Sequence, residues 1–296
     1  MKIASAPCSY GVHGRSTVAV QPAELLEAMA EAGYTGSELG PPGFFGTPEQ
    51  TARAFADAGL AAVGGYVPLH LSRDDDVFAA DVAAMRRTLE ELQACGEPGA
   101  RAVLADEGDD DLRARPWRAD GERGMSREAW QRAVERIAAA CEIVRAHGLT
   151  PVFHPHYGTY VQQASEIDTL LDLTDVGLCL DSGHFALGGA DPAGYARRHA
   201  DRLVHVHVKD VRHAVVADAQ ARGDTDLEGW WARVSVPLGT GDVDLAAFVA
   251  EVRAAGYDGW YVVEQDRAPV TPDTWEEVAA DQRANLAWLT RALAVR

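Results

Sequence analysis

The sequence predicts an α/β protein with one domain over residues 1–296, folded as a (β/α)8 TIM barrel. Short apolar runs alternate with amphipathic helical patterns along the whole chain, which is typical of a parallel sheet. The runs number eight and no Pro-, Gly- or Ser-rich linker divides them, so a closed barrel fits better than an open sheet. No GxGxxG motif follows the first run, which disfavours a dinucleotide-binding fold.

The strands and helices follow from these patterns. The predicted strands are Ile3–Ala6, Gly36–Leu39, Ala61–Val67, Ala102–Leu104, Thr150–His154, Gly177–Leu180, Leu203–Val208 and Trp260–Val263. Apolar residues at helical spacing predict helices between them, clearest over 130–144 and 245–252. A glycine precedes a strand at four predicted helix ends, where a left-handed residue stops the helix, and these are Gly33, Gly59, Gly148 and Gly256.

Composition excludes several classes of partner. The chain has 27 Lys and Arg against 45 Asp and Glu, and this net charge of −18 repels nucleic acid and anionic membranes. No apolar run approaches the roughly 18 to 20 residues that span a bilayer, and the first residues lack the apolar core of a secretory signal. The four cysteines are scattered without a CxxC pair, which indicates reduced thiols. We therefore expect a cytoplasmic protein without nucleic-acid or membrane partners.

Two segments are longer than simple connections. Asp106–Met125 and Val211–Val234 each follow a predicted strand, and the second contains Trp230 and Trp231. Loops of this length in a compact domain are usually lids or binding loops, so both are expected at the catalytic end.

Other charged or glycine-rich segments are predicted to be structural. Pro237–Asp244 has the glycines of a phosphate-binding loop, but it is acidic and lacks Lys and Arg. Asp244 is instead predicted to cap a helix that begins at Leu245. The charged helical faces around 86–91 and 127–136 are predicted to be solvated surface.

Residues of types that bind metals lie at the carboxyl ends of four neighbouring predicted strands. In a (β/α)8 barrel the polar residues at the carboxyl ends of the strands face the active site. Side chains alternate along a strand, so residues two apart share a face. Imidazoles and carboxylates that converge there form a nitrogen and oxygen site, which suits Mn²⁺, Co²⁺, Fe²⁺ or Zn²⁺ better than Ca²⁺. The candidates are His154, His156, Asp181, His184, His205, His207, Lys209 and Glu264.

Two further residues end earlier strands. Glu38 follows the second strand, where its carboxylate either binds substrate hydroxyls or caps the next turn. His70 ends the third strand, where it either contacts substrate or is a structural histidine.

Four motifs resemble the sugar isomerase/epimerase barrels, which include xylose isomerase-like proteins, tagatose epimerases and endonuclease IV. They are DSGH at Asp181–His184, HVHVKD at His205–Asp210, PLGTGDVD at Pro237–Asp244 and AGYDGWYVVEQD at Ala255–Asp266. Three more are similar to the inosose dehydratases within that family, namely Gly33–Gly46, Val63–Leu71 and Phe153–Val161. The resemblance runs from Ile3 to about Asp266.

The resemblance implies one divalent metal, held by a glutamate, an aspartate, a histidine and a second glutamate. By motif Asp181, His207 and Glu264 match the last three, and His184 matches a histidine that contacts substrate. The fifth strand departs from the pattern, because His154 stands where the family usually has glutamate. Mn²⁺ or Co²⁺ is expected first, with Zn²⁺ and Fe²⁺ as alternatives. The inosose dehydratases have been associated with glutathione, but nothing in this sequence identifies a site for it.

The resemblance favours a hydro-lyase of inositol catabolism that dehydrates a cyclic polyol ketone, with 2-keto-myo-inositol (inosose) as the first candidate. Dehydration needs one base for the α-proton, one acid for the departing hydroxyl and a Lewis acid for the oxygens. Our hypothesis is that His154 or His156 ligates the metal, and that the other transfers protons together with Glu264, His184 or Lys209. The sequence does not rank these residues.

Several alternatives remain open from the sequence. A keto-sugar isomerase or epimerase, or a 3-keto-glycoside lyase, could use the same metal site. A relative of the DNA-repair endonucleases is disfavoured by the acidic charge. A metal-binding protein without catalysis would keep the site but lack an open pocket. Trp275 and Trp288 could pack on the barrel or on a second subunit, so a homo-oligomer stays open.

Overall fold

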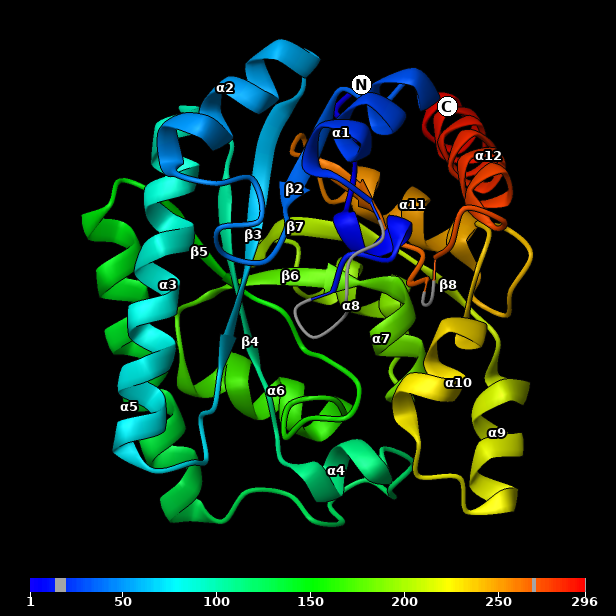
Figure 1. Ribbon diagram of the computed structural model, residues 1–296. Coiled ribbons are helices and arrows are strands. Elements are labelled where there is room, and N and C mark those ends of the chain that lie inside the picture. Colours follow the sequence, from blue (N-terminus) through cyan, green and yellow to red (C-terminus); the bar gives the residue numbers. More distant parts are fainter. Residues whose placement is uncertain (14–19, 268–269, 296) are drawn as a thin grey trace.

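The computed structural model describes residues 1–13, 20–267 and 270–295 (Figure 1). Eight parallel strands form a closed barrel in the order β1-β10-β7-β6-β5-β4-β3-β2, which confirms the predicted fold class. The barrel strands are β1 (Ile3–Ser5), β2 (Gly36–Leu39), β3 (Ala61–Leu69), β4 (Arg101–Asp106), β5 (Thr150–Phe153), β6 (Gly177–Asp181), β7 (Leu203–Val208) and β10 (Tyr261–Val263). All eight overlap predicted runs, and β2 and β7 have the predicted bounds. β3 and β4 extend furthest beyond the prediction, to Leu69 in β3 and to Arg101 and Asp106 in β4, because the prediction followed only the apolar runs.

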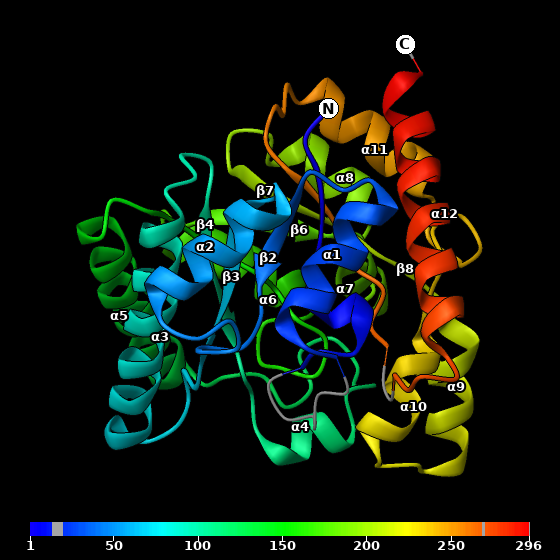
Figure 2. The ribbon, with the colours of Figure 1, turned by 45° about the horizontal axis from the view of Figure 1, so that its top comes forward.

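Helices surround the barrel, as the two ribbon views show (Figures 1 and 2). They are α1 (Pro22–Ala32), α2 (Pro48–Ala58), α3 (Asp75–Cys95), α4 (Asp110–Ala114), α5 (Arg127–Ala146), α6 (Ala164–Leu173), α7 (Ser182–Leu187), α8 (Pro192–Arg198), α9 (His213–Arg222), α10 (Leu227–Val234), α11 (Leu245–Ala254) and α12 (Trp275–Ala294), with a 3-10 turn at Pro7–Tyr10. In the part of the chain that the structure describes, no helix combines the length and apolarity needed to cross a membrane.

The helix ends bear out the glycine signal. Gly33 and Gly59 have φ of 99° and 68° and end α1 and α2 directly. Gly148 and Gly256 also have positive φ, of 73° and 78°, but each lies one residue beyond the helix cap.

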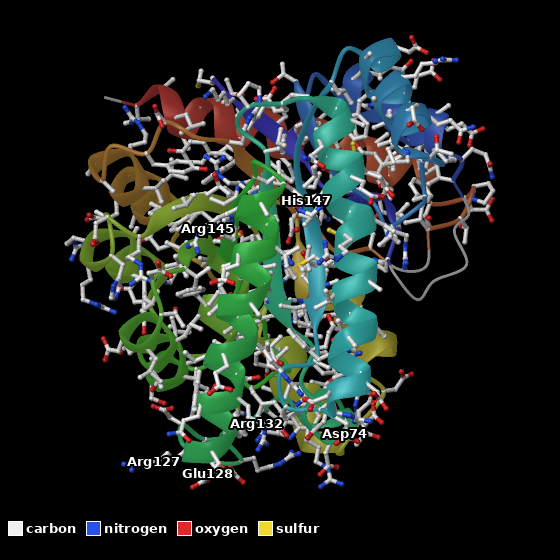
Figure 3. All side chains as sticks on the ribbon, turned by 90° about the vertical axis from the view of Figure 1, so that its left-hand side faces the viewer. Asp74, Arg127, Glu128, Arg132, Arg145 and His147 are labelled. Atoms are coloured by element: carbon white, nitrogen blue, oxygen red, sulfur yellow. The ribbon has the colours of Figure 1, made fainter. Side chains whose placement is uncertain are left out.

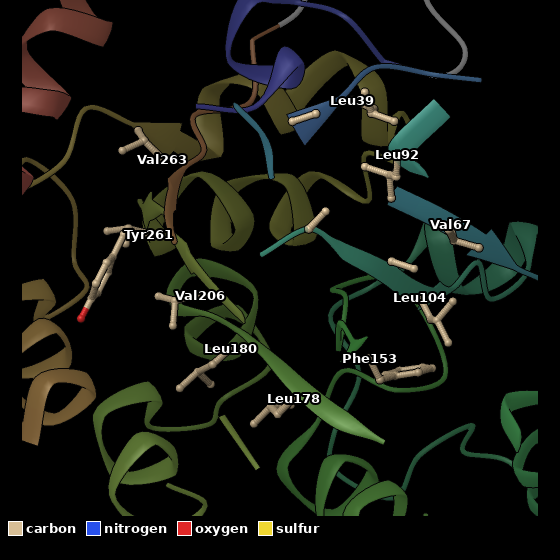
Figure 4. Close-up of a cluster of buried hydrophobic side chains, with 14 of the residues drawn as sticks. Leu39, Val67, Leu92, Leu104, Phe153, Leu178, Leu180, Val206, Tyr261 and Val263 are labelled. Carbon is tan, nitrogen blue, oxygen red and sulfur yellow. The ribbon is translucent and has the colours of Figure 1, made fainter. Parts of the chain in front are cut away.

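The core has an outer and an inner part. Apolar strand residues such as Leu104, Phe153 and Leu180 belong to a large buried cluster that includes residues of the surrounding helices (Figure 4). Alternate residues form smaller buried clusters of their own, one around Val262 and one around Val103. Along β6 and β7 the same alternation puts Cys179, Asp181, His205 and His207 on the face away from that outer cluster.

Both long segments contain helices rather than irregular loops. α4 lies in the first, and α9 and α10 lie in the second, between the short antiparallel strands β8 (Asp210–Val211) and β9 (Ser235–Val236). The two segments meet where Trp117 packs against Trp230, with ring centroids 5.9 Å apart. We call the second one the 210–236 segment.

One expectation about the surface is wrong for two residues. Arg136 of α5 is buried, and its Nη1 donates to the backbone oxygens of His70, Leu71 and Arg73. Glu91 of α3 is also buried, where it accepts from the backbone N–H of Gly43. Helical periodicity does not reveal that loops cover these charges. Figure 3 shows α5 beside α3, with Arg127, Glu128 and Arg132 near one end and Arg145 and His147 near the other.

Candidate metal centre and active site

Four potential ligands converge at the carboxyl ends of four neighbouring strands. Ligand atoms of His154, Asp181, His207 and Glu264, all buried, lie within 4.8 Å of one another. His154 Nε2 is 3.6 Å from Asp181 Oδ2, and His207 Nδ1 is 3.3 Å from Glu264 Oε1. The structure thus brings together the four residues that the sequence suggested as ligands, including His154 rather than His156.

The chemistry of this cluster suits a cation. Among the described residues, both ring nitrogens of His154 and Oδ2 of Asp181 are buried without a hydrogen-bond partner. Buried polar atoms without partners are costly, and a bound cation would remove that cost. Two imidazoles and two carboxylates form the donor set of Mn²⁺, Co²⁺, Fe²⁺ or Zn²⁺ sites. The residues therefore fit a divalent transition metal.

Asp181 uses its two carboxylate oxygens differently. Oδ1 accepts from the backbone N–H groups of Gly183 and His184, at 2.7 and 2.8 Å, and so caps the first turn of α7. This fixes the carboxylate and leaves Oδ2 facing the cluster. The helix that follows the strand thereby orients a potential ligand.

Glu38 contacts Nε2 of His207, the ring nitrogen that does not face the other potential ligands. Its Oε1 accepts from Nε2 of His205 at 2.8 Å and from Nε2 of His207 at 3.0 Å. Burial raises the pKa of Glu38, but the charge of His207 and the two hydrogen bonds outweigh burial and bring it to about 2. Contact of Glu38 with a substrate stays a prediction, because the carboxylate is buried and the partners it has here are histidines.

The hydrogen bond to Glu38 determines which ring nitrogen of His207 is available as a ligand. A carboxylate only accepts, so Nε2 of His207 carries a proton and Nδ1 faces the proposed ligands. Burial lowers the pKa of His207, but Cys179, Glu264 and Glu38 together raise it well above its usual value. A metal ion would therefore displace the Nδ1 proton as it binds.

Lys209 is a buried ammonium group beside the cluster. Its Nζ lies 2.9 Å from Glu264 Oε2, 2.9 Å from Asp266 Oδ2 and 3.0 Å from His184 Nε2. Burial lowers the pKa of Lys209, but Asp266 and Glu264 raise it well above its usual value. A Cβ at Gly183 would come within 2.7 Å of the Lys209 side chain, so the glycine leaves room for it.

His156 and His184 are neutral neighbours at the edge of the cluster, with ring centroids 3.9 Å apart. Burial, then His154 and Lys209, lower the pKa of His156 to about 4. Its Nδ1 lies 2.9 Å from the oxygen of Tyr157 and so carries the proton, which makes Nε2 a potential base. Burial, then His156 and Lys209, also lower the pKa of His184. Its Nδ1 accepts from the backbone N–H of Tyr157 at 3.1 Å, and its Nε2 lies 3.0 Å from the Lys209 ammonium, so both ring nitrogens of His184 face donors.

His70 stands apart from the cluster. It is partly exposed, its Nδ1 lies 3.1 Å from Asp81, and it lines a separate cavity of about 130 Å³ with Glu107 and Arg113. Tyr66 connects the two places, because its hydroxyl donates to Glu107 at 3.0 Å and its ring lies edge-on to His154. A substrate contact by His70 stays a prediction.

Three residues near the cluster were not proposed from the sequence. Asp266 follows Glu264 by two residues, so strand alternation could have placed it on the same face. Tyr66 is an ordinary strand aromatic and gave no usable signal. Trp231 lies in a segment that the sequence placed at the catalytic end, but nothing in the sequence distinguished it from Trp230. Cys8 also lies nearby, where burial, then Glu264 and Asp266, raise the pKa of its thiol. A protonated thiol is a weak nucleophile.

The glycine-rich Pro237–Asp244 loop binds a carboxylate of the protein itself, the side chain of Asp210. The N–H groups of Gly239 and Gly241 each donate to Oδ2 of Asp210 at 2.9 Å. A Cβ at Gly241 would approach Asp210 to 2.2 Å, which explains the glycine. Asp244 accepts from the N–H of Ala247 at 3.0 Å and caps α11, as predicted.

Two curated relatives are similar over most of the chain. The rhizopine catabolism protein MocC of Rhizobium meliloti is 34% identical over 280 residues, 89% of this chain and 81% of its own length. The inosose dehydratase of Geobacillus kaustophilus is 31% identical over 268 residues, 87% of this chain and 85% of its own.

Solved structures share the fold at lower identity. The IOLI protein with a binding zinc atom has a TM-score of 0.72 at 15% identity, covering 99% of this chain and 98% of that one. The probable 3-DHS dehydratase AsbF of Bacillus anthracis also has a TM-score of 0.72, at 18% identity, covering 98% and 99%. The chain spans 43% of a similar xylose isomerase-like TIM barrel/4-hydroxyphenylpyruvate dioxygenase fusion protein. Residues 26–292 match the model of one family, and the chain belongs to that family, the xylose isomerase-like TIM barrels.

Proposed function

We propose that the chain is a metal-dependent hydro-lyase that dehydrates a cyclic polyol ketone, with 2-keto-myo-inositol as the first candidate. The observation that carries the proposal is the cluster of His154, Asp181, His207 and Glu264, with the Lys209 ammonium 2.9 Å from Glu264. The similarity to an inosose dehydratase at 31% identity supports the substrate class.

The four clustered residues would hold the metal, and Glu38 would orient His207 through the hydrogen bond to its Nε2. Mn²⁺ and Co²⁺ are our first candidates, and the zinc atom bound to the similar IOLI protein keeps Zn²⁺ among them. When bound, the metal would supply Lewis acidity to a ketone oxygen and a neighbouring hydroxyl of the substrate. That makes the α-carbon proton more acidic.

Lys209 is assigned as the general acid. It is held as an ammonium by Glu264 and Asp266, and it is the only lysine of the chain besides Lys2. As the C–O bond of the β-hydroxyl breaks, Lys209 donates one proton to the departing oxygen, which leaves as water.

His156 is assigned as the general base. The hydrogen bond from its Nδ1 to the oxygen of Tyr157 leaves Nε2 unprotonated, and the residue keeps some exposure to solvent. Nε2 takes the α-proton, and the electron pair of that C–H bond becomes the new C=C bond. His184, whose ring centroid lies 3.9 Å from that of His156, is assigned to binding a substrate hydroxyl. The proton gained by His156 balances the proton lost by Lys209, and exchange with water restores both.

An isomerase or epimerase on a keto sugar is the second candidate. Solved structures with this fold include an L-ribulose 3-epimerase, with a TM-score of 0.70 at 18% identity. His154 stands against this reading, because the family's epimerases use two glutamates on opposite faces of one carbon. The chain has only Glu264 in such a position among the four proposed ligands.

The test begins with protein stripped by a chelator and restored with Mn²⁺, Co²⁺ or Zn²⁺ in separate samples. 2-Keto-myo-inositol is added and the product is followed by mass spectrometry. Metal-dependent loss of one water supports the proposal. A product of unchanged mass but changed chromatographic position supports the isomerase, and metal binding with no product from a panel of keto polyols rejects both.

A further inference from the structure

The 210–236 segment places an indole ring in the proposed active site. Nε1 of Trp231 donates to Oδ2 of Asp266 at 3.0 Å. That same oxygen accepts from Nζ of Lys209 at 2.9 Å. The indole ring stacks on His184, with centroids 5.5 Å apart and an interplanar angle of 22°. Trp231 therefore contacts one of the two carboxylates that hold the assigned acid, and a residue assigned to substrate binding.

The neighbouring tryptophan has a different role. Trp230 is fully buried in a cluster with Tyr157, Val211 and Ala219, which docks the segment on the barrel. Its indole nitrogen has no hydrogen-bond partner among the described residues. The two adjacent tryptophans of α10 therefore differ in their contacts. Trp230 packs in the apolar cluster, whereas Trp231 donates a hydrogen bond to Asp266.

We propose that Trp231 is a positioning residue that fixes the Lys209 ammonium through Asp266. The inference rests on the proposed function for its catalytic meaning, but the contact itself does not. Asp266 Oδ2 accepts from two different side chains, so the indole N–H restrains the carboxylate that holds Lys209. Docking of the 210–236 segment thereby completes the site, because Trp231 reaches Asp266 only when α10 is in place.

The kinetic test compares W231F, which keeps an aromatic ring but loses the N–H, with W230F as matched control. W231F is expected to lower kcat about 10-fold, the effect of losing one hydrogen bond to a charged group, with little change in KM. W230F removes an unpaired N–H from the same helix, so its kcat stays close to that of the parent even where its Tm falls. In a double-mutant cycle, W231F adds little to D266N if Trp231 acts through Asp266.

A second readout does not depend on turnover. The chain has two lysines, Lys2 and Lys209, so ¹⁵N-lysine labelling gives at most two ammonium signals in an NMR spectrum. Lys2 is exposed and Lys209 is buried, so a slowly exchanging signal belongs to Lys209. W231F is expected to shift or broaden that signal, and W230F is expected to leave it in place.

The outcomes separate the two proposals. An unchanged Lys209 signal in W231F, or equal effects of W231F and W230F, overturns the positioning role. Additive losses in the cycle with D266N do the same. A parent protein that does not dehydrate keto polyols overturns the proposed function alone, because the NMR comparison still decides whether Trp231 holds Asp266 and Lys209.

Discussion

Replacing Glu38 with glutamine should weaken metal binding without removing any proposed ligand. Glu38 accepts from Nε2 of both His205 and His207 through one oxygen. Glutamine has nearly the same shape and still offers an oxygen, but it lacks the negative charge. E38Q therefore tests whether the charge behind His207 strengthens that histidine as a ligand.

The structure gives the size of the expected effect. The pKa of Glu38 falls from 4.5 to about 2 despite burial. That displacement corresponds to on the order of 3 kcal/mol of interaction with the charged form. The two histidines share it, so His207 alone accounts for between about 1 and 2 kcal/mol, or a roughly 5- to 30-fold weaker Kd for the metal. Groups behind metal-binding histidines typically contribute about 10- to 100-fold, which agrees.

The assay is a titration of chelator-stripped protein with Mn²⁺, Co²⁺ and Zn²⁺ in competition with a metal-binding dye. E91Q serves as control, because Glu91 is also a buried carboxylate but lies away from the cluster. Thermal unfolding of both variants checks that the fold is intact. A folded E38Q that binds metal as tightly as the parent protein would refute the reasoning.

Three further predictions concern the cluster and its surroundings. D181A should lose bound metal and turnover together, measured by elemental analysis and the dehydration assay; normal metal content with normal turnover would rule out the proposed centre. K209M should retain metal but lose about 10²- to 10⁴-fold in kcat, the usual contribution of a general acid, and an unchanged kcat would remove Lys209 from that role. Asp106 predicts a pH effect on stability, because burial, against hydrogen bonds from the backbone of Tyr160 and Leu71, raises its pKa from 3.8 to about 6. Because the folded-state pKa of Asp106 lies above the unfolded-state value near 4, the contribution of this carboxyl group to the free energy of unfolding is highest below about pH 4. It falls by on the order of 3 kcal/mol as the pH rises through about 6 and the buried carboxyl group ionises. Denaturant unfolding between pH 4 and 7 should therefore show a smaller decline for D106N than for the parent or for the exposed D57N control, and equal declines would contradict the assignment.

The barrel was predictable because its pattern is local. The last four apolar runs each end in or lead directly into a polar residue, and alternation along β6 and β7 puts Asp181 and His207 on one face. Side chains that depend on distant segments were not predictable. Trp231 reaches Asp266 from a separate segment, and Arg136 is buried by the loop after β3. The pattern of the second strand located Glu38, but its partners come from a strand 167 residues away in the sequence.

The closure of the barrel also has a consequence for folding. Ile3 pairs with Tyr261 and Ser5 pairs with Val263, so the first strand completes its ladder only with the last. During synthesis one edge of β1 stays unpaired until residues 261–263 have left the ribosome, and pairings this distant in sequence are slow to form. Glu264 directly follows the last strand, so the metal centre becomes complete in the same late step. A nascent chain arrested before that point would expose strand edges and depend on chaperones.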